Sequence, residues 1–312
     1  MKAINLILSA AKAKKYAEAY EDSPLVNEIE GIGLHPEINE HLESGNIHSP
    51  AVLSAVTKTA RRLIKAGHST GFESDRPKKG SSRAVFFPSE PHKIILDGKP
   101  TGAHSVVKIA FPGVLDKYTG DETLLGQHQN SIENDYFAQK HWGVLRRKDD
   151  HSGHFETNHE TGILPPVFDS HPNDHWLHMG RIRKAKAADW KKLTKTPDFP
   201  KGITHEQMYD TLMHHYAQAH GQKWHAAEKH DIDKLSEHPF IHTVNDFVAT
   251  MGQHPGDYHV DNMGVYEHPH GSKHLVISDY GFSTEVAKMY HNARKNQQRA
   301  YENRMFNLWR HV

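Results

Sequence analysis

The stretch Gly256–Asn262, with the sequence GDYHVDN, and the tripeptide Asp279–Gly281 that follows it decide how this chain is interpreted. Two β-prone runs lie between them, Asn262–Glu267 and His274–Asp279, and a turn-rich hexapeptide separates the two runs. The sequence therefore predicts a β-hairpin that begins at the asparagine and ends at the aspartate.

The hairpin predicts a cluster of oxygen ligands at its open end. If the turn is symmetric about His270 and Gly271, Asn262 lies opposite Asp279, and paired positions hold their Cβ atoms about 4.5–5.5 Å apart. An amide oxygen and a carboxylate are hard ligands that suit Mg²⁺, which fills its other positions with water and phosphate oxygens. Asp257, on the loop before the hairpin, could then orient a hydroxyl nucleophile and accept its proton.

This pattern resembles a known family. Asp257-x-x-x-x-Asn262 followed by Asp279-x-Gly281 resembles the catalytic and metal-binding loops of the protein-kinase-like superfamily. The local form, with His259 two residues after the aspartate, is closer to aminoglycoside phosphotransferases and other kinase-like enzymes of bacteria and phages than to eukaryotic protein kinases. The resemblance implies that ATP and Mg²⁺ are the cofactors, that Asp257 is catalytic, and that Asn262 and Asp279 bind the metal.

One position of the catalytic loop departs from the family. Pro255 stands where the family usually has a histidine two residues before the aspartate, and His254 lies one place earlier. The resemblance covers residues 256–281 specifically and the remainder of the chain only loosely.

The resemblance implies an α+β fold with two lobes of the protein-kinase-like kind. We expect a helical N-terminal extension (1–66), a small antiparallel-sheet N-lobe that binds nucleotide (67–179) and a mainly helical C-lobe with the catalytic and metal loops (180–312). The C-lobe is reduced, because only 31 residues follow Gly281 and they contain no Ala-Pro-Glu motif. The compact form and the extension suggest a phage-encoded kinase.

The predicted N-lobe contains a candidate phosphate-binding lysine. Strands are predicted at Arg83–Phe87, His92–Leu96 and Ser105–Phe111, with a turn at Asp97-Gly98. Lys108 interrupts the apolar run of the third strand. By resemblance it is the kinase lysine that binds the nucleotide phosphates; the alternative is an edge-strand lysine whose ammonium reaches water.

A kinase-like lysine needs a carboxylate to hold it. A single helix is predicted at Asn130–Trp142, and Glu133 on it is the preferred partner of Lys108. Glu122 is the alternative, since it is nearer in sequence but lies in a turn.

The nucleotide-covering loop has the weakest signal in the chain. Gly80, Ser81 and Ser82 supply one glycine and two hydroxyls, and backbone donors there could bind phosphate. The competing interpretation is a surface turn with a solvated Arg83.

The segment between the lobes is predicted as a strand pair, Ile163–Phe168 and Trp176–Gly180. By resemblance, backbone groups near Leu177 and Met179 would contact adenine; the alternative is that both residues belong to a core strand.

The predicted C-lobe is helical. Helices are expected at Ala185–Leu193, at Thr204–His220 with Thr204 as N-cap, at Pro239–Met251 and at Thr284–Tyr301. The third helix leads directly into the catalytic loop.

Composition bounds the partners. The 312 residues include 38 basic and 38 acidic side chains, so no global charge favours nucleic acid or an anionic membrane, and no cysteine is present. No apolar run is long enough for a membrane span. We expect a cytoplasmic protein, in the host cytoplasm if phage-encoded. The 29 histidines suggest a metal protein as a minor alternative, with His171, His175 and His178 at helical spacing.

The sequence therefore predicts a kinase that transfers the γ-phosphate of ATP to a hydroxyl. A protein acceptor is favoured because residues 180–239 are rich in lysine and histidine, whereas an aminoglycoside-type pocket would be acidic. A small-molecule kinase is the first alternative. A catalytically weak pseudokinase or virion-associated binding protein is the second.

Overall fold

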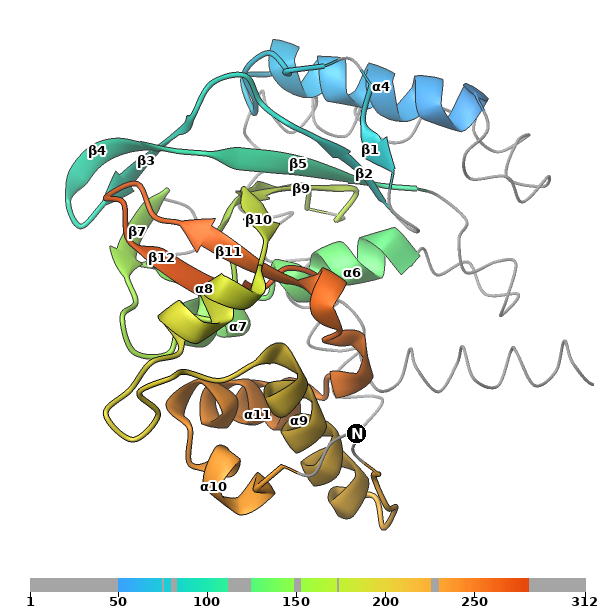
Figure 1. The fold of residues 1–312 in the computed structure, drawn as a ribbon. Coiled ribbons are helices and arrows are strands. Elements are labelled where there is room, and N and C mark those ends of the chain that lie inside the picture. Colours follow the sequence, from blue (N-terminus) through green and yellow to red (C-terminus); the bar gives the residue numbers. More distant parts are fainter. Residues whose placement is uncertain are drawn as a thin grey trace, which may run out of the picture.

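The chain is an α+β protein, as the sequence predicts (Figure 1). The computed structural model describes residues 50–74, 76–79, 83–111, 125–148, 153–172, 174–225 and 230–280. Most of the predicted N-terminal extension and the helix expected at Thr284–Tyr301 lie outside these ranges.

The helices and strands follow one another in a mixed order. The α-helices are α4 (Pro50–Lys65), α6 (Leu125–Glu133), α7 (Tyr136–Trp142), α8 (Ala187–Leu193), α9 (His205–Ala219), α10 (Ile232–Ser236) and α11 (Pro239–Met251), and the 3-10 helices are η1 (Pro255–Asp257) and η2 (Val260–Asn262). The strands are β1 (Lys78–Lys79), β2 (Arg83–Phe86), β3 (His92–Leu96), β4 (Lys99–Ala103), β5 (Ser105–Ala110), β6 (Leu145–Arg147), β7 (His154–Thr157), β8 (Val167–Ser170), β9 (Trp176–Gly180), β10 (Ile182–Lys184), β11 (Met263–Glu267) and β12 (Lys273–Ile277).

The largest sheet has five antiparallel strands in the order β1-β2-β5-β9-β8. Because side chains alternate along a strand, each strand contributes to both faces. Ile109 of β5 faces a cluster that includes Phe86, Trp176 and residues of α4. Its neighbour Lys108, which pairs with Val85 and Leu177, faces the other way.

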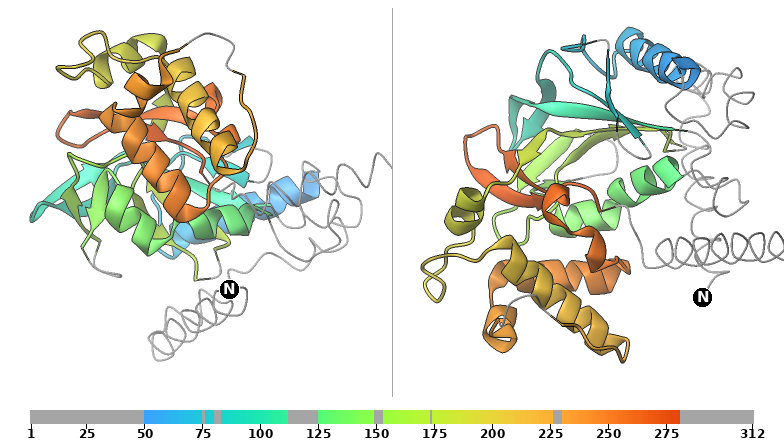
Figure 2. Two further views of the ribbon diagram at one scale, coloured as in Figure 1. Left: turned by 90° about the horizontal axis from the view of Figure 1, so that it is seen from below. Right: turned by 45° about the vertical axis from the view of Figure 1, so that its right-hand side comes forward.

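Helices cover both faces of this sheet. Leu53, Val56, Ala60 and Leu63 recur at helical spacing on α4 and pack on one face. The right-hand view of Figure 2 shows α6 beneath the opposite face. None of the helices in the described ranges combines the length and apolar character needed to cross a membrane.

Two smaller sheets complete the strand structure, with the orders β4-β3-β7-β6 and β10-β11-β12. The hairpin of β3 and β4 turns at Asp97 and Gly98, which adopt positive φ values of 49° and 79°. This pair matches the turn predicted from the sequence, since Asp and Gly tolerate that conformation well.

The predicted hairpin near the end of the chain is present, but its predicted register is wrong by one residue. Met263 pairs with Ile277 and Glu267 with Lys273, so the connection has five residues and is centred on His270. The chain reverses there through Gly271, whose φ is +89°. Asn262 is therefore opposite Ser278, whose N–H donates to the Asn262 carbonyl at 2.8 Å, and Asp279 lies one residue further along.

The single helix predicted at Asn130–Trp142 is also wrong, because two helices occupy the region. α6 ends at Glu133, and Asp135 then caps α7 by accepting a 3.0 Å hydrogen bond from the N–H of Ala138. A carboxylate that bonds to nearby backbone N–H groups favours a new helix start over a continuous helix. The break leaves Glu133 at a helix end.

The remaining helices pack around the hairpin (Figure 1). α9 has the predicted cap, since Thr204 and Gln207 exchange side chain to backbone hydrogen bonds at 3.2 and 2.8 Å. α11 begins at Pro239 as predicted and ends at Gly252, a C-cap with φ of +61°.

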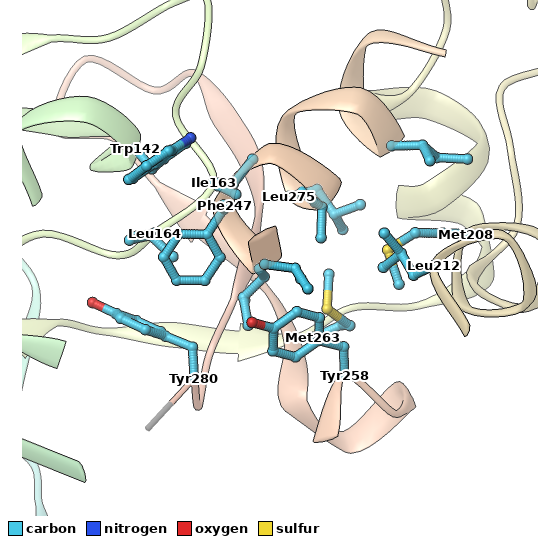
Figure 3. Packing of buried hydrophobic residues seen from close by; sticks show 14 of the residues in the cluster. Trp142, Ile163, Leu164, Met208, Leu212, Phe247, Tyr258, Met263, Leu275 and Tyr280 are labelled. Carbon is cyan, nitrogen blue, oxygen red and sulfur yellow. The ribbon is translucent and has the colours of Figure 1, made fainter. Parts of the chain in front are cut away.

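Buried aromatic residues connect α11 to α7 and to the segment after β12 (Figure 3). The ring of Phe247 lies 5.3 Å from that of Trp142 on α7 and 5.6 Å from that of Tyr280, in edge-to-face geometry in both cases. Contacts of this kind stabilise beyond the area that they bury. The packing fixes the segment after β12 against α7 and α11.

Buried histidines make stability sensitive to acid. His178 on β9 is 1% exposed, its ring nitrogens contact the His68 carbonyl and the Ser105 hydroxyl, and burial lowers its pKa to about 3. The unfolded chain then binds a proton that the native state does not, so the free energy of unfolding falls as pH drops from about 6.5 towards 3.

We expect His178→Gln to reduce this pH dependence by up to about 1.4 kcal/mol per pH unit. Denaturant unfolding between pH 7.5 and 4 would measure the slope, which separates the titration from any uniform loss of stability. An unchanged slope in the variant would contradict the prediction.

Candidate active site

Lys108 and Glu133 form a buried ion pair beneath the five-stranded sheet. The Nζ of Lys108 donates to both carboxylate oxygens of Glu133 at 3.0 Å, and Glu133 is fully buried at the last position of α6. The contact predicted from the sequence is therefore present. The alternative partner, Glu122, lies outside the described residues.

Lys108 also reaches the segment after β12. Its Nζ donates to the carbonyl of Ser278 at 3.3 Å. Burial lowers the pKa of Lys108, and so does the positive charge of Arg83, whereas Glu133 and Asp279 raise it in part. One ammonium thus bridges β5, α6 and the residue before Asp279.

Arg83 is a second cation in the same place, and the sequence alone left it equally able to be solvated. Its side chain is only 4% exposed, forms an ion pair with Glu133 at 2.9 Å, and donates to Asn130 at 3.2 Å and to Asp279 at 2.6 Å. Burial opposes its charge, but Asp279 and Glu133 outweigh that cost and raise its pKa. Alternation of side chains along β2 is the feature that places Arg83 here. Arg83 lies two residues from Val85, which pairs with Lys108, so Arg83 and Lys108 share one sheet face.

Asp279 is a charged carboxylate within reach of solvent. Burial alone would raise its pKa, but Arg83 and Lys108 lower it on balance. The side chain remains 36% exposed, so a metal ion or phosphate could approach it.

Asn262 lies at the hairpin end, opposite Ser278 and one residue out of register with Asp279, and is bonded to the loop that contains Asp257. Its Nδ2 donates to the carbonyl of Asp257 at 2.8 Å, which leaves the amide oxygen as the group able to bind a metal. Two hard oxygen ligands fit Mg²⁺, which takes few protein ligands beside water and phosphate. Within the described part of the chain, no three His, Asp or Glu side chains form a metal cluster.

Asp257 ends η1 beside these groups. Burial, followed by the negative charge of Asp279, raises its pKa to about 7, although Arg83 opposes the shift. A half-buried carboxylate of this kind can accept a proton near neutral pH.

The loop that contains Asp257 is held from α9. His254 accepts a 3.1 Å hydrogen bond from the N–H of Gly256, and its ring lies 4.8 Å from that of Tyr216. His205 donates from Nε2 to the carbonyl of Tyr258 at 2.9 Å. Pro255, where the kinase-like family usually has histidine, is buried at the start of η1. Two other histidines, His205 and His254, make the hydrogen bonds to this loop.

Tyr280 and Gln139 fix the end of α6, and sequence reasoning missed both. The Tyr280 hydroxyl donates to the carbonyl of Glu133 at 2.8 Å and accepts from the Nε2 of Gln139 at 2.8 Å. Gln139 also donates to that carbonyl at 3.0 Å and accepts from the N–H of Val167 at 3.2 Å. Tyr280, the neighbour of Asp279, is thus bonded to Glu133, which pairs with both Lys108 and Arg83.

The residues predicted to contact nucleotide are placed only in part. Gly80, Ser81 and Ser82 lie outside the described residues. Leu177 and Met179 lie in β9, which pairs with β5 and β8 on its two edges. The backbone N–H and C=O groups of both residues therefore point towards the neighbouring strands. Contact with a base would involve their side chains, which lie on the same sheet face as Lys108.

The histidines with helical spacing do not share a helix. His171 follows β8, His175 precedes β9 and His178 lies within β9. The ring nitrogens of His178 contact a carbonyl and a hydroxyl of the protein.

Comparison with protein-family models, curated proteins and solved structures finds no match for this chain.

Glu133→Gln should destabilise the protein strongly, because it leaves the charges of Lys108 and Arg83 buried without their shared carboxylate. Breaking a buried pair of this kind costs about 3–5 kcal/mol, measurable by denaturant unfolding. Asp261→Asn is the matched control, since Asp261 pairs with Lys184 at an exposed site and should leave the unfolding midpoint nearly unchanged. Equal effects of the two substitutions would contradict the ion-pair arrangement.

Two tyrosines of one cluster provide a second test. Tyr280 and Tyr258 are both fully buried, but the Tyr258 hydroxyl has no hydrogen-bond partner within the described ranges. We expect Tyr280→Phe to cost about 0.5–1.5 kcal/mol because it removes two buried hydrogen bonds, and Tyr258→Phe to be neutral or stabilising. Thermal unfolding of both variants measures the difference, and a reversed order would refute the assigned hydrogen bonds.

Proposed function

We propose that this protein is a kinase that transfers the γ-phosphate of ATP to a hydroxyl with the help of Mg²⁺. The observation that carries the proposal is the convergence of Lys108, Glu133 and Asp279 beneath one sheet face, with Lys108 bonded to Glu133 and to the residue before Asp279. Strong ion pairs and shifted pKa values concentrated at one place are typical of functional sites.

The proposal includes a two-lobed arrangement of the kinase-like kind. Residues 67–179, with the five-stranded sheet and α6, would be the N-lobe, and residues 180–312 the C-lobe. The chain passes between them at Arg181, whose N–H still bonds to the carbonyl of His104, before β10 joins the hairpin sheet. A nucleotide would bind between the sheet face and the hairpin end.

A buried apolar cluster lies on the same sheet face as Lys108. Val106, Val167, Leu177 and Met179 form a separate buried cluster there, with Val85 and Phe87 packed against it. Strand pairing places Met179 beside Val106 and Leu177 beside Lys108. Apolar side chains next to cations that would bind phosphate suit a purine nucleotide, which would reach these buried residues only where the packing over them opens.

The chemical work would consist of positioning and charge neutralisation. Asn262 and Asp279 would hold Mg²⁺, which neutralises phosphate charge when bound. Lys108, held by Glu133, would bind phosphate oxygens. Asp257 would orient the acceptor hydroxyl and take its proton. Phosphoryl transfer requires little covalent chemistry from the protein, so such fixed charges account for most of the rate.

The acceptor is proposed to be a protein hydroxyl. Lys191, Lys192, Lys195 and Lys201 are exposed on and after α8. A basic surface favours an acidic protein segment over a polycationic small molecule.

A pseudokinase is the second candidate, and one observation favours it. Arg83 binds the carboxylate that the metal would need. A nucleotide-dependent rise in unfolding temperature without phosphate transfer or ATP hydrolysis would support this alternative.

Labelling with γ-labelled ATP and a bacterial lysate as the source of acceptors tests the kinase directly. We expect wild-type protein to label an acceptor and Asp257→Asn to reduce the initial rate by about 100-fold or more, since the residue would act as the base. Asp261→Asn, four residues away and exposed, should retain the wild-type rate. Equal labelling by wild type and Asp257→Asn would refute the assignment.

A further inference from the structure

The site contains more positive charge than a single lysine and glutamate pair requires. Glu133 is within 3.0 Å of both Arg83 and Lys108, so one carboxylate serves two cations. The second positive charge is balanced by Asp279, which Arg83 contacts at 2.6 Å. The charge of Arg83 is therefore balanced by a residue outside the pair of Lys108 and Glu133.

Structural need alone does not account for Arg83. A buried guanidinium near an ammonium adds repulsion, and apolar residues of similar volume often serve stability as well as a buried ion pair. The residue also begins β2, the strand that pairs antiparallel with β1 on the other side of residues 80–82.

We propose that Arg83 is a phosphate-binding residue that competes with Mg²⁺ for Asp279. With Mg²⁺ bound, the Asp279 carboxylate would be one of its ligands, and the Arg83 guanidinium, without that partner, would bind a phosphate of the nucleoside triphosphate. This inference rests on the proposed nucleotide site. It assigns to Arg83 the phosphate-binding role for which the sequence otherwise offers only Gly80, Ser81 and Ser82.

The chemistry of the groups supports the exchange. Mg²⁺ and Arg83 are two cations drawn to one carboxylate, so each weakens the binding of the other. A planar guanidinium makes paired hydrogen bonds with phosphate as readily as with carboxylate. One terminal nitrogen of Arg83, Nη1, contacts Glu133 and Asn130, and the other, Nη2, contacts Asp279. Arg83 therefore stays close to the site while Nη2 exchanges the carboxylate for a phosphate.

The test compares metal binding and nucleotide binding in Arg83→Met. Mn²⁺ alone, followed by electron paramagnetic resonance of the free ion, should bind several-fold more tightly than to wild type because Asp279 is released. ATP in the presence of Mg²⁺, followed by calorimetry, should bind about tenfold or more weakly because a charged hydrogen bond to phosphate is lost. A misfolded variant would lose both affinities, so the opposite signs are diagnostic.

Two further variants complete the experiment. Asp279→Asn in the Arg83→Met background should abolish the gain in Mn²⁺ affinity. Arg83→Lys keeps the charge and is the substitute if Arg83→Met does not fold; its ATP affinity should fall and its Mn²⁺ affinity rise, both by less.

The outcomes separate this inference from the proposed function. If wild-type protein binds neither Mn²⁺ nor ATP, the proposed function fails. If wild type binds both, but Arg83 variants that still unfold cooperatively keep the wild-type ATP affinity or show no gain in Mn²⁺ affinity, the role of Arg83 is refuted and the nucleotide site stands.

Discussion

The buried carboxylate of Glu133 is the group on which the arrangement of the site depends. It is fully buried, accepts hydrogen bonds from Lys108 and forms a salt bridge with Arg83. A buried charge without partners would be very costly, so β2, β5 and α6 must lie where the two cations can reach it. The backbone of the same residue is bonded to Tyr280 and Gln139, which extends the constraint to the segment after β12.

This constraint also sets the electrostatics of the neighbouring groups. Lys108 and Arg83 keep Asp279 ionised, and the charge of Asp279 together with burial raises the pKa of Asp257. The pKa values of two neighbouring carboxylates thus shift in opposite directions, because burial dominates at Asp257 and the charges of Arg83 and Lys108 dominate at Asp279. The division between an ionised ligand and a carboxylate able to exchange a proton suits the proposed phosphoryl transfer.

Features that depend on neighbouring residues were predictable from the sequence. The Asp97-Gly98 turn, the cap at Thr204 and the helix from Pro239 follow from local conformational preferences, and the structure has them. The hairpin after Asn262 was predicted, but its register was not, because the five-residue turn places its centre at His270. The break before α7 was missed because Asp135 prefers to cap a helix, a competition that apolar periodicity does not reveal.

For the site, the sequence by itself determined which residue types are available. Lys108, Glu133, Asp257, Asn262 and Asp279 were recognised by type, spacing and order. Only the tertiary structure decided that Arg83 joins them, by a contact with Asp279 that spans 196 residues of chain. The physical reason is that local conformation depends on adjacent residues, whereas the partner of a buried charge depends on which strands and helices pack together.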